Sequence, residues 1–302
     1  MVKVIAVFCP TGRQGASVIK TLTRDPTYKV RALTRDASST KARELASQGL
    51  EVVQVDLNDR QNIVNALKGA YGCYVTTFTD LSNPFCADIE VEQGMNIADA
   101  CLEVKIQHIV YHTQINIMNV LGINARNMVA KAQVEGYMKS RGLPVTSVIM
   151  PLYYEEFFDR LRPMREGHDH YSLVIPMGHI PLDMMSVEDL GPVVHQLFNH
   201  AGQFMDKTIS LSGEKTTIKE MAQMFGRQLG KSFIDKQVTV EEFRNLNQGQ
   251  PWSRDWANMF DFLKRVDQTN SVTLTRKLNP NLRGLEAWIR DNRAALLQSL
   301  CH

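Results

Sequence analysis

Two glycines near the start of the chain are the residues with the clearest chemical potential. Gly12 and Gly15 lie in the run Cys9-Pro10-Thr11-Gly12-Arg13-Gln14-Gly15, between the apolar run 3–8 and a segment with helical spacing. Glycine lets the backbone turn tightly and approach a ligand. A helix that begins there presents unpaired N–H groups and a partial positive charge, both of which suit a pyrophosphate. The turn is therefore a candidate phosphate-binding site, and the alternative is a tight turn that binds nothing.

Cys9 gives this turn a second feature. It stands where the first glycine of a dinucleotide-binding turn is usual. A thiol at a helix N-terminus has a lowered pKa and is easily oxidised, which would make Cys9 reactive. The alternative, which we favour, is a small residue that takes the place of glycine.

Basic residues near the end of the second predicted strand favour a 2′-phosphate. NAD-binding sheets usually have an acidic residue there, which binds the ribose 2′-hydroxyl. This chain has Arg35 instead, and a guanidinium can bind a phosphate through two parallel hydrogen bonds. Arg13 in the glycine turn is placed to bind the same phosphate or to stack on the adenine, whereas Asp36 weakens the pattern. We therefore expect NADP(H) rather than NAD(H), with a solvated strand-end charge as the other interpretation of Arg35.

Two further strand ends carry candidate binding residues. Asp56 and Leu57 follow the third predicted strand, where the carboxylate would accept from the adenine amino group and the leucine would pack on the ring. The run from Asp56 to Asp59 is equally suited to open a turn and cap the next helix, so both interpretations stay open. Three residues at the end of the fourth predicted strand lie on the side of the sheet where ligands bind: Thr76, Thr77 and Phe78.

Short β-rich runs alternate with helical patterns through the first half of the chain. The predicted strands are 3–8, 29–34, 51–55, 72–77, 107–112 and 145–150, with helices between them. Such alternation with short links implies parallel strands joined by right-handed crossovers. The sequence predicts an α/β fold with a doubly wound parallel sheet over residues 1–152 and a smaller, mostly helical domain over 153–302. A helix over 186–199, with Ser186 and Asp189 at capping-box spacing, is expected to pack back on the sheet.

Composition limits the class of protein. The chain has 302 residues, of which 44% are hydrophobic and 22% charged, which is typical of a globular protein. A net charge of +2 without a basic stripe gives no reason to expect a nucleic-acid partner, and no apolar run approaches the ~20 residues that span a bilayer. Five cysteines without close pairing fit a reducing compartment, so we expect the cytoplasm, and entry into the nucleus stays open. The loop His168-Asp169-His170 lacks a distant third ligand, and no metal is expected.

Several runs resemble the NmrA-like group of atypical short-chain dehydrogenases. They include Thr11-Gly12-Arg13-Gln14-Gly15 and Met185-Ser186-Val187-Glu188-Asp189-Leu190-Gly191, and further ones at 30–35, 49–56, 69–71, 256–260 and 278–280 extend over nearly the whole chain. The animal members of the group are the most similar. The resemblance implies a Rossmann-type domain that binds NADP(H), and a redox sensor whose cofactor occupancy changes its conformation and its choice of protein partner. Close relatives reduce quinones and phenylpropanoids, and Cys9 departs from the glycine that the group usually has.

The catalytic pair of short-chain dehydrogenases is incomplete here. Those enzymes use a tyrosine four residues before a lysine, so both lie on one helical face and the lysine lowers the pKa of the phenol. The lysine is Lys131, but the residue four before it is Asn127, which cannot exchange a proton at neutral pH. The resemblance still implies that Lys131 binds the nicotinamide ribose, and an exposed helix lysine is the alternative. Thr113 at the end of the fifth strand and Tyr153 after the sixth would line the same region, although clustered aromatics more often form core. His112 could donate a proton near neutrality, although a hydrogen-bonded strand-end histidine is the commoner case.

We therefore expect an NADP(H)-binding, redox-responsive regulator that acts through protein partners. An NADPH-dependent reductase of quinones or enones is the alternative, because such acceptors are easily reduced without a tyrosine acid. A third interpretation is a scaffold that has lost cofactor binding, given Cys9 and Pro10. The identity of the partners and the formation of a homodimer stay open.

Overall fold

The computed structural model describes residues 2–267 and 269–301, which form two compact units. The first unit holds the residues up to Asn116, together with Arg126–Ile149 and Leu190–Ile209. The second holds Ile117–Ala125, Met150–Asp189 and the described residues from Ser210 onward. The helix expected over 186–199 therefore belongs, from Leu190, to the first unit.

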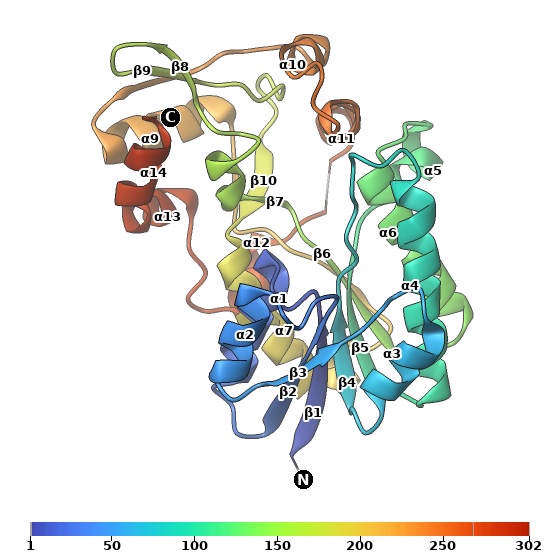
Figure 1. Ribbon diagram of the computed structural model, residues 1–302. Coiled ribbons are helices and arrows are strands. Elements are labelled where there is room, and N and C mark those ends of the chain that lie inside the picture. Colours follow the sequence, from blue (N-terminus) through green and yellow to red (C-terminus); the bar gives the residue numbers. More distant parts are fainter. Residues whose placement is uncertain (1, 268, 302) are drawn as a thin grey trace. The chain divides into compact units, whose positions relative to one another are not determined.

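A seven-stranded sheet forms the centre of the first unit (Figure 1). Its strands are β1 (Lys3–Phe8), β2 (Tyr28–Thr34), β3 (Glu51–Gln54), β4 (Gly72–Val75), β5 (His108–Thr113), β6 (Val145–Ile149) and β11 (Thr208–Ser210). They lie in the order β11-β6-β5-β4-β1-β2-β3, and the pairs among β1 to β6 are parallel. The strand order reverses between β1 and β4, so the predicted doubly wound α/β fold is confirmed.

Helices cover both faces of this sheet (Figure 1). On one face, α4 (Cys86–Glu103) packs against both α3 (Arg60–Leu67) and α6 (Arg126–Ser140). On the other face, α1 (Arg13–Leu22) packs against α7 (Leu190–Asn199). The unit also contains α2 (Thr40–Ser47) and α8 (Ala201–Phe204). A hydrophobic core of the unit lies under α3, α4 and α6 and buries Phe8, Ile97 and Val134.

Local sequence explains most of the element boundaries but not the start of α7. Residues 5–8 of β1 are all buried, because helices cover both faces of that strand. The capping box predicted at Ser186 and Asp189 is wrong. The Ser186 hydroxyl donates to the Glu155 carboxylate at 2.6 Å, and α7 begins only at Leu190. The same hydroxyl oxygen accepts the N–H of Glu188 at 3.3 Å and so begins the 3₁₀ turn Val187–Asp189, whereas the Asp189 carboxylate accepts the N–H of Arg283 at 3.4 Å instead of that of Ser186.

Two three-stranded sheets and a set of helices form the second unit. The sheets have the orders β12-β10-β7 and β13-β9-β8. Their strands are β7 (Leu152–Tyr153), β8 (Met164–Gly167), β9 (His170–Leu173), β10 (Leu182–Met185), β12 (Glu214–Thr216) and β13 (Ser232–Asp235). The helices are α5 (Ile117–Leu121), α9 (Ile218–Leu229), α10 (Val240–Leu246), α11 (Ser253–Arg265), α12 (Val272–Leu278), α13 (Leu285–Asp291) and α14 (Arg293–Ser299).

Aromatic side chains fill the core of the second unit. The Trp288 ring lies 5.6 Å from that of Tyr154, and the Phe157 ring lies 4.8 Å from that of Phe225. The aromatic cluster that the sequence carries after the sixth strand is thus core material. No helix in the described part of the chain is long and apolar enough to cross a membrane.

The pairing of α1 with α7 depends on a glycine. The backbone N–H of Gly191 donates to the Ser17 hydroxyl at 3.0 Å. A Cβ at Gly191 would lie 2.2 Å from the Ser17 carbonyl oxygen, which is far inside van der Waals contact. Because α1 carries the glycine turn at its amino end, this contact also fixes the helix that begins the candidate site.

Gly191→Ala should therefore destabilise the protein, by about 1–3 kcal/mol or more, since the helices must move apart. Gly136→Ala is the matched control, because Gly136 lies in α6 and nothing would approach its Cβ within 4 Å. Alanine favours a helix, so the control should gain about 0.5–1 kcal/mol. Urea unfolding of both variants measures the difference. Equal stability of the two would show that α1 and α7 are not held by this contact.

Candidate functional site

The glycine turn lies where the strand order reverses. It follows β1, which has β2 on one side and β4 on the other, and doubly wound sheets bind ligands at this position. Gly12 is the N-cap of α1 and provides no side chain to cover the first turn of the helix. A Cβ at Gly15 would lie 2.3 Å from the Cys9 carbonyl oxygen, so only glycine lets the helix begin this close to the strand.

Cys9 has a backbone conformation that favours glycine. Its φ of +51° lies in the left-handed region, and its carbonyl oxygen accepts the N–H of Gly12 at 3.0 Å. Its thiol donates to the Thr76 carbonyl oxygen at 3.3 Å, which links the ends of β1 and β4. Burial raises the pKa of the Cys9 thiol, although Arg35 and Lys131 act in the opposite direction. The interpretation of Cys9 as an activated thiol is therefore wrong, and a small residue in place of glycine fits the geometry.

Gln14 connects α1 to two strands of the sheet. Its Oε1 accepts from the hydroxyl of Tyr74 in β4, and its Nε2 lies 3.2 Å from Nδ1 of His112 in β5. The hydroxyl oxygen of Thr76 lies 3.3 Å from the same imidazole nitrogen. Gln14 therefore fixes the amino end of α1 against β4 and β5, while Thr11 in the same turn is half-buried.

Arg35 and Phe78 meet although they follow different strands. The Arg35 guanidinium lies 5.5 Å from the centre of the Phe78 ring, and both side chains are exposed. They follow β2 and β4, which flank β1, so the pair lies at the carboxyl end of the central strand. The Asp36 carboxylate accepts from both the N–H and the hydroxyl of Ser38, which lowers its pKa. Arg13 is exposed in the first turn of α1.

Asp56 and Leu57 take part in the turn before α3. One carboxylate oxygen of Asp56 accepts from the backbone and the side-chain amide of Asn58, both at 2.9 Å. Leu57 is partly buried against the core under α3 and α4. Asp59, not Asp56, caps α3, by accepting the N–H of Asn62 at 3.1 Å. Of the two interpretations of Asp56, the structure thus shows the turn. Adenine binding by Asp56 and Leu57 stays a prediction.

A buried ion pair lies beneath the carboxyl ends of β4 and β5. The Lys131 ammonium lies 2.5 Å from the Glu90 carboxylate, and the Glu90 side chain is completely buried. Glu90 also accepts from the hydroxyls of Thr77 and Thr79, and the latter accepts from Lys131 at 3.0 Å. Lys131 is therefore already bound to a carboxylate. The sequence had suggested either a ribose-binding lysine or an exposed helix lysine, and neither interpretation included this ion pair.

Glu90 is a site residue that the sequence reasoning missed. It lies on the buried face of α4, with Cys86 one turn before it and Gly94 one turn after it. A carboxylate among small and apolar residues at helical spacing is a usable signal, because buried charges are nearly always paired. The partner was not evident, since Lys131 is 41 positions further along the chain.

The end of β5 places alternate side chains on opposite faces of the sheet. The Tyr111 hydroxyl donates to the Lys131 carbonyl oxygen at 3.1 Å, and the Thr113 hydroxyl donates to Glu135 at 2.9 Å. Between them, His112 contacts Gln14. Burial, with a smaller contribution from Lys131, lowers the pKa of His112 to about 3. His112 is thus neutral at physiological pH and is not poised to act as an acid.

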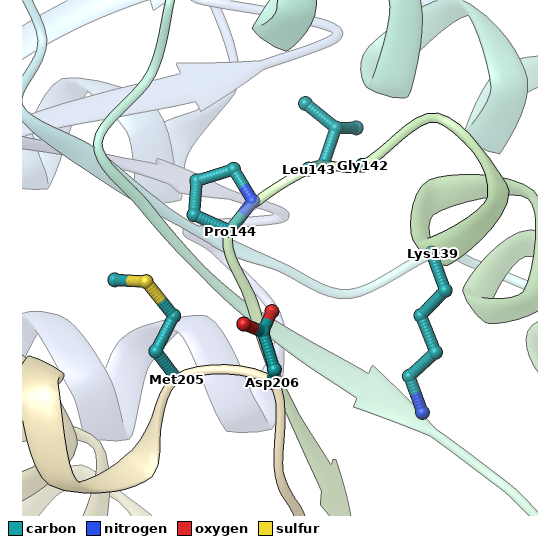
Figure 2. A pocket seen from close by; sticks show the side chains of 6 residues that line it. All are labelled: Lys139, Gly142, Leu143, Pro144, Met205 and Asp206. Atoms are coloured by element: carbon teal, nitrogen blue, oxygen red, sulfur yellow. The ribbon is translucent and has the colours of Figure 1, made fainter.

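Tyr153 and a pocket belong to different units of the structure. Tyr153 is in β7, in the second unit. Figure 2 shows a pocket of about 450 Å³ in the first unit, lined by Lys139, Gly142, Leu143, Pro144, Met205 and Asp206. It lies beside the amino end of β6, and therefore at the edge of the sheet opposite the glycine turn. In the described ranges, no group of three His, Cys, Asp or Glu side chains could hold a metal ion.

The Glu90–Lys131 pair should contribute strongly to stability, because loss of one partner leaves a buried charge uncompensated. We expect Glu90→Gln or Lys131→Met to cost about 3–5 kcal/mol each, and the double variant to cost far less than their sum. The exposed pair Arg60–Glu103, at 2.7 Å, is the control, and its coupling should be below about 1 kcal/mol. Double-mutant cycles by urea unfolding measure both couplings. A buried coupling no larger than the surface one would contradict the assignment.

Known proteins share both sequence and fold with this chain. An NmrA-like family domain-containing protein of Dictyostelium discoideum is 24% identical over 95% of this chain and 96% of its own length. An NmrA-like family domain-containing oxidoreductase of Malbranchea aurantiaca is 27% identical over 76% of this chain and 74% of its own length.

Solved structures agree with this likeness at the level of the fold. NmrA, a negative transcriptional regulator solved with NADP, superposes with a TM-score of 0.80 at 22% identity, over 99% of this chain and 97% of that one. The triphenylmethane reductase of Citrobacter, complexed with NADP(H), gives 0.79 at 21% identity, over 95% and 99% of the two chains. The NADPH-dependent quinone oxidoreductase of Escherichia coli, complexed with NADPH, gives 0.77 at 17% identity, over 97% and 99%.

A single family model matches almost the entire chain. The NmrA-like family model aligns with residues 1–289, which include the glycine turn, the Arg35–Phe78 pair and the Glu90–Lys131 ion pair. The fold, the relatives and this match all agree. The chain belongs to the NmrA-like family.

Proposed function

We propose that this chain binds NADP(H) at the carboxyl edge of its seven-stranded sheet and acts as a redox-responsive regulator through protein partners. The close approach of Gly15 to the Cys9 carbonyl is the observation that carries the proposal. It lets α1 begin directly after β1, so that the first turn of the helix, which no side chain caps, lies where the strand order reverses. A helix N-terminus in that position binds a pyrophosphate. The NADP complex of NmrA supports the same cofactor here. Within the family, we group the chain with the animal members.

Arg35 supports a cofactor with a 2′-phosphate. Its exposed guanidinium can donate two parallel N–H bonds to a phosphate on the adenine ribose. Asp36, the acidic residue that would favour the free 2′-hydroxyl, has its carboxylate bonded to Ser38. Arg13, in the first turn of α1, is a second exposed positive charge. The proposed contacts are therefore stronger for NADP(H) than for NAD(H).

The remaining site residues support binding rather than proton transfer. Bound NADP(H) supplies a hydride in its reduced form and a positively charged ring in its oxidised form. Lys131 would hold the nicotinamide ribose, and Glu90 fixes the ammonium in place. Asn127 has no titratable proton, and His112 has a pKa of about 3, so neither donates a proton at neutral pH. A cofactor that is held without efficient turnover suits a regulator whose partners distinguish its two redox states.

A reductase is the second candidate function. Curated relatives are named oxidoreductases, and two of the structures that share this fold belong to a triphenylmethane reductase and a quinone oxidoreductase. Hydride transfer to an easily reduced acceptor does not require a tyrosine acid. Quinones and enones are the substrates we would test.

Arg35→Ala should weaken NADPH binding by roughly 10- to 100-fold, because the lost hydrogen bonds involve charged groups. NADH affinity should change by no more than about twofold. Arg24→Ala, an exposed substitution after the other end of α1, is the control and should leave both affinities unchanged. Fluorescence titration of the reduced cofactors measures all of these affinities. Equal losses for NADPH and NADH would show that Arg35 does not bind the 2′-phosphate, and absence of saturable NADPH binding at millimolar concentration would refute the proposal.

Oxidation of NADPH in the presence of a panel of quinones distinguishes the two candidate functions. A regulator without an acid should turn over well below ~1 s⁻¹ with every acceptor, since ordinary enzymes reach that rate or exceed it. Absorbance at the reduced-nicotinamide band follows the reaction. Turnover above this level with any quinone would favour the reductase.

A further inference from the structure

The polar contacts of Gln14 determine which nitrogen of His112 carries the proton. Gln14 Oε1 accepts from the Tyr74 hydroxyl, so the amide nitrogen of the same side chain faces His112. That Nε2 donates to Nδ1 of His112 at 3.2 Å. The Thr76 hydroxyl lies 3.3 Å from the same nitrogen and can donate as well. Because Nδ1 is an acceptor, the imidazole proton of the neutral ring lies on Nε2.

The Nε2–H group of His112 has no acceptor. The side chain is 4% exposed, and Nε2 is buried without a hydrogen-bond partner among the described residues. An unpaired buried donor is costly, and native structures seldom retain one without a function. The low pKa keeps the ring neutral, and thus keeps this donor, throughout the physiological range. The missing acceptor must come from outside the chain.

The position of His112 indicates which part of a ligand would provide that acceptor. His112 lies at the carboxyl end of β5, next to β4, on the other side of the strand reversal from Arg35 at the end of β2. A dinucleotide bound at a doubly wound sheet extends across the reversal. If the 2′-phosphate of the adenosine half binds Arg35, the nicotinamide–ribose half extends toward β4 and β5. Its hydroxyls and carboxamide oxygen are hydrogen-bond acceptors.

We propose that the Nε2–H of His112 is a binding group for an oxygen of the nicotinamide–ribose half of the cofactor. The inference rests on the proposed NADP(H) function and adds a specific contact to it. His112 acts as a neutral donor that positions the nicotinamide half, and it transfers no proton. Gln14 acts through His112, because its amide orientation selects the tautomer. The glycine-turn helix and the nicotinamide position are thereby connected through one hydrogen-bonded chain from α1 to β5.

Two measurements test this inference. Long-range ¹H–¹⁵N spectra of protein labelled at histidine should show the His112 proton on Nε2 between pH 6 and 8, and the Nε2 resonance should shift when NADPH binds. In Gln14→Glu, a carboxylate faces Nδ1 and should move the proton to that nitrogen. If the His112 proton of the wild-type protein lies on Nδ1, the inference is overturned. This measurement uses the wild-type protein, so it does not require that any variant fold.

Affinities for cofactor fragments locate the contact. His112→Phe should weaken NADPH binding by roughly tenfold and leave the affinity for 2′-phospho-ADP-ribose, which lacks nicotinamide, unchanged. His195→Phe is the control, since His195 pairs with Asp25 beyond the opposite end of α1 and should alter neither affinity. Unchanged NADPH binding by His112→Phe, or equal losses for both ligands, would overturn the inference and leave the proposed function standing. A wild-type protein that binds neither ligand would overturn the proposed function, and this inference with it.

Discussion

The close approach of helix α1 to the end of β1 is the constraint on which the rest of the site depends. Gly15 has no room for a Cβ beside the Cys9 carbonyl, so the helix begins directly against the strand with its first turn uncapped. Elsewhere along α1, the backbone of Gly191 in α7 lies so close to Ser17 that a Cβ at Gly191 would be 2.2 Å from the Ser17 carbonyl oxygen. Gln14 then joins the same helix to β4 and β5. A single helix therefore carries the proposed phosphate site, contacts α7 and, in our proposal, determines the proton position on His112.

Positive charge near this edge has two distinct environments. Arg35 and Arg13 are exposed to solvent, whereas Lys131 is buried and bound to Glu90 and Thr79. The net charge of +2 conveys none of this arrangement. Exposed arginines suit recognition of a phosphate that arrives from solvent, because their desolvation cost is small. The buried Lys131 is instead a fixed part of the structure. Only the Glu90 carboxylate compensates its charge, because the Thr79 hydroxyl is neutral.

Local pattern was sufficient for strands β1 to β6, the glycine turn and the doubly wound class of the sheet, because continuous apolar runs and short links leave few topologies for a parallel sheet. It failed wherever the partner of a side chain is distant in the sequence. Asp189 accepts from Arg283 instead of completing a capping box with Ser186, and Glu90 in α4 pairs with Lys131 in α6. The thiol of Cys9 has its pKa set by burial, which sequence position alone does not reveal. The short strands β7, β10 and β12 have too few residues for a recognisable period, and their pairing comes from tertiary contacts.

A crystal structure of the protein grown with NADPH would show directly whether the glycine turn is the cofactor site. We expect the pyrophosphate at the amino end of α1, between Gly12 and Gly15, with the 2′-phosphate against Arg35 and the nicotinamide half toward β5. Density for the cofactor at another edge of the sheet, or its absence at a saturating concentration, would contradict the assignment of the glycine turn as the binding site.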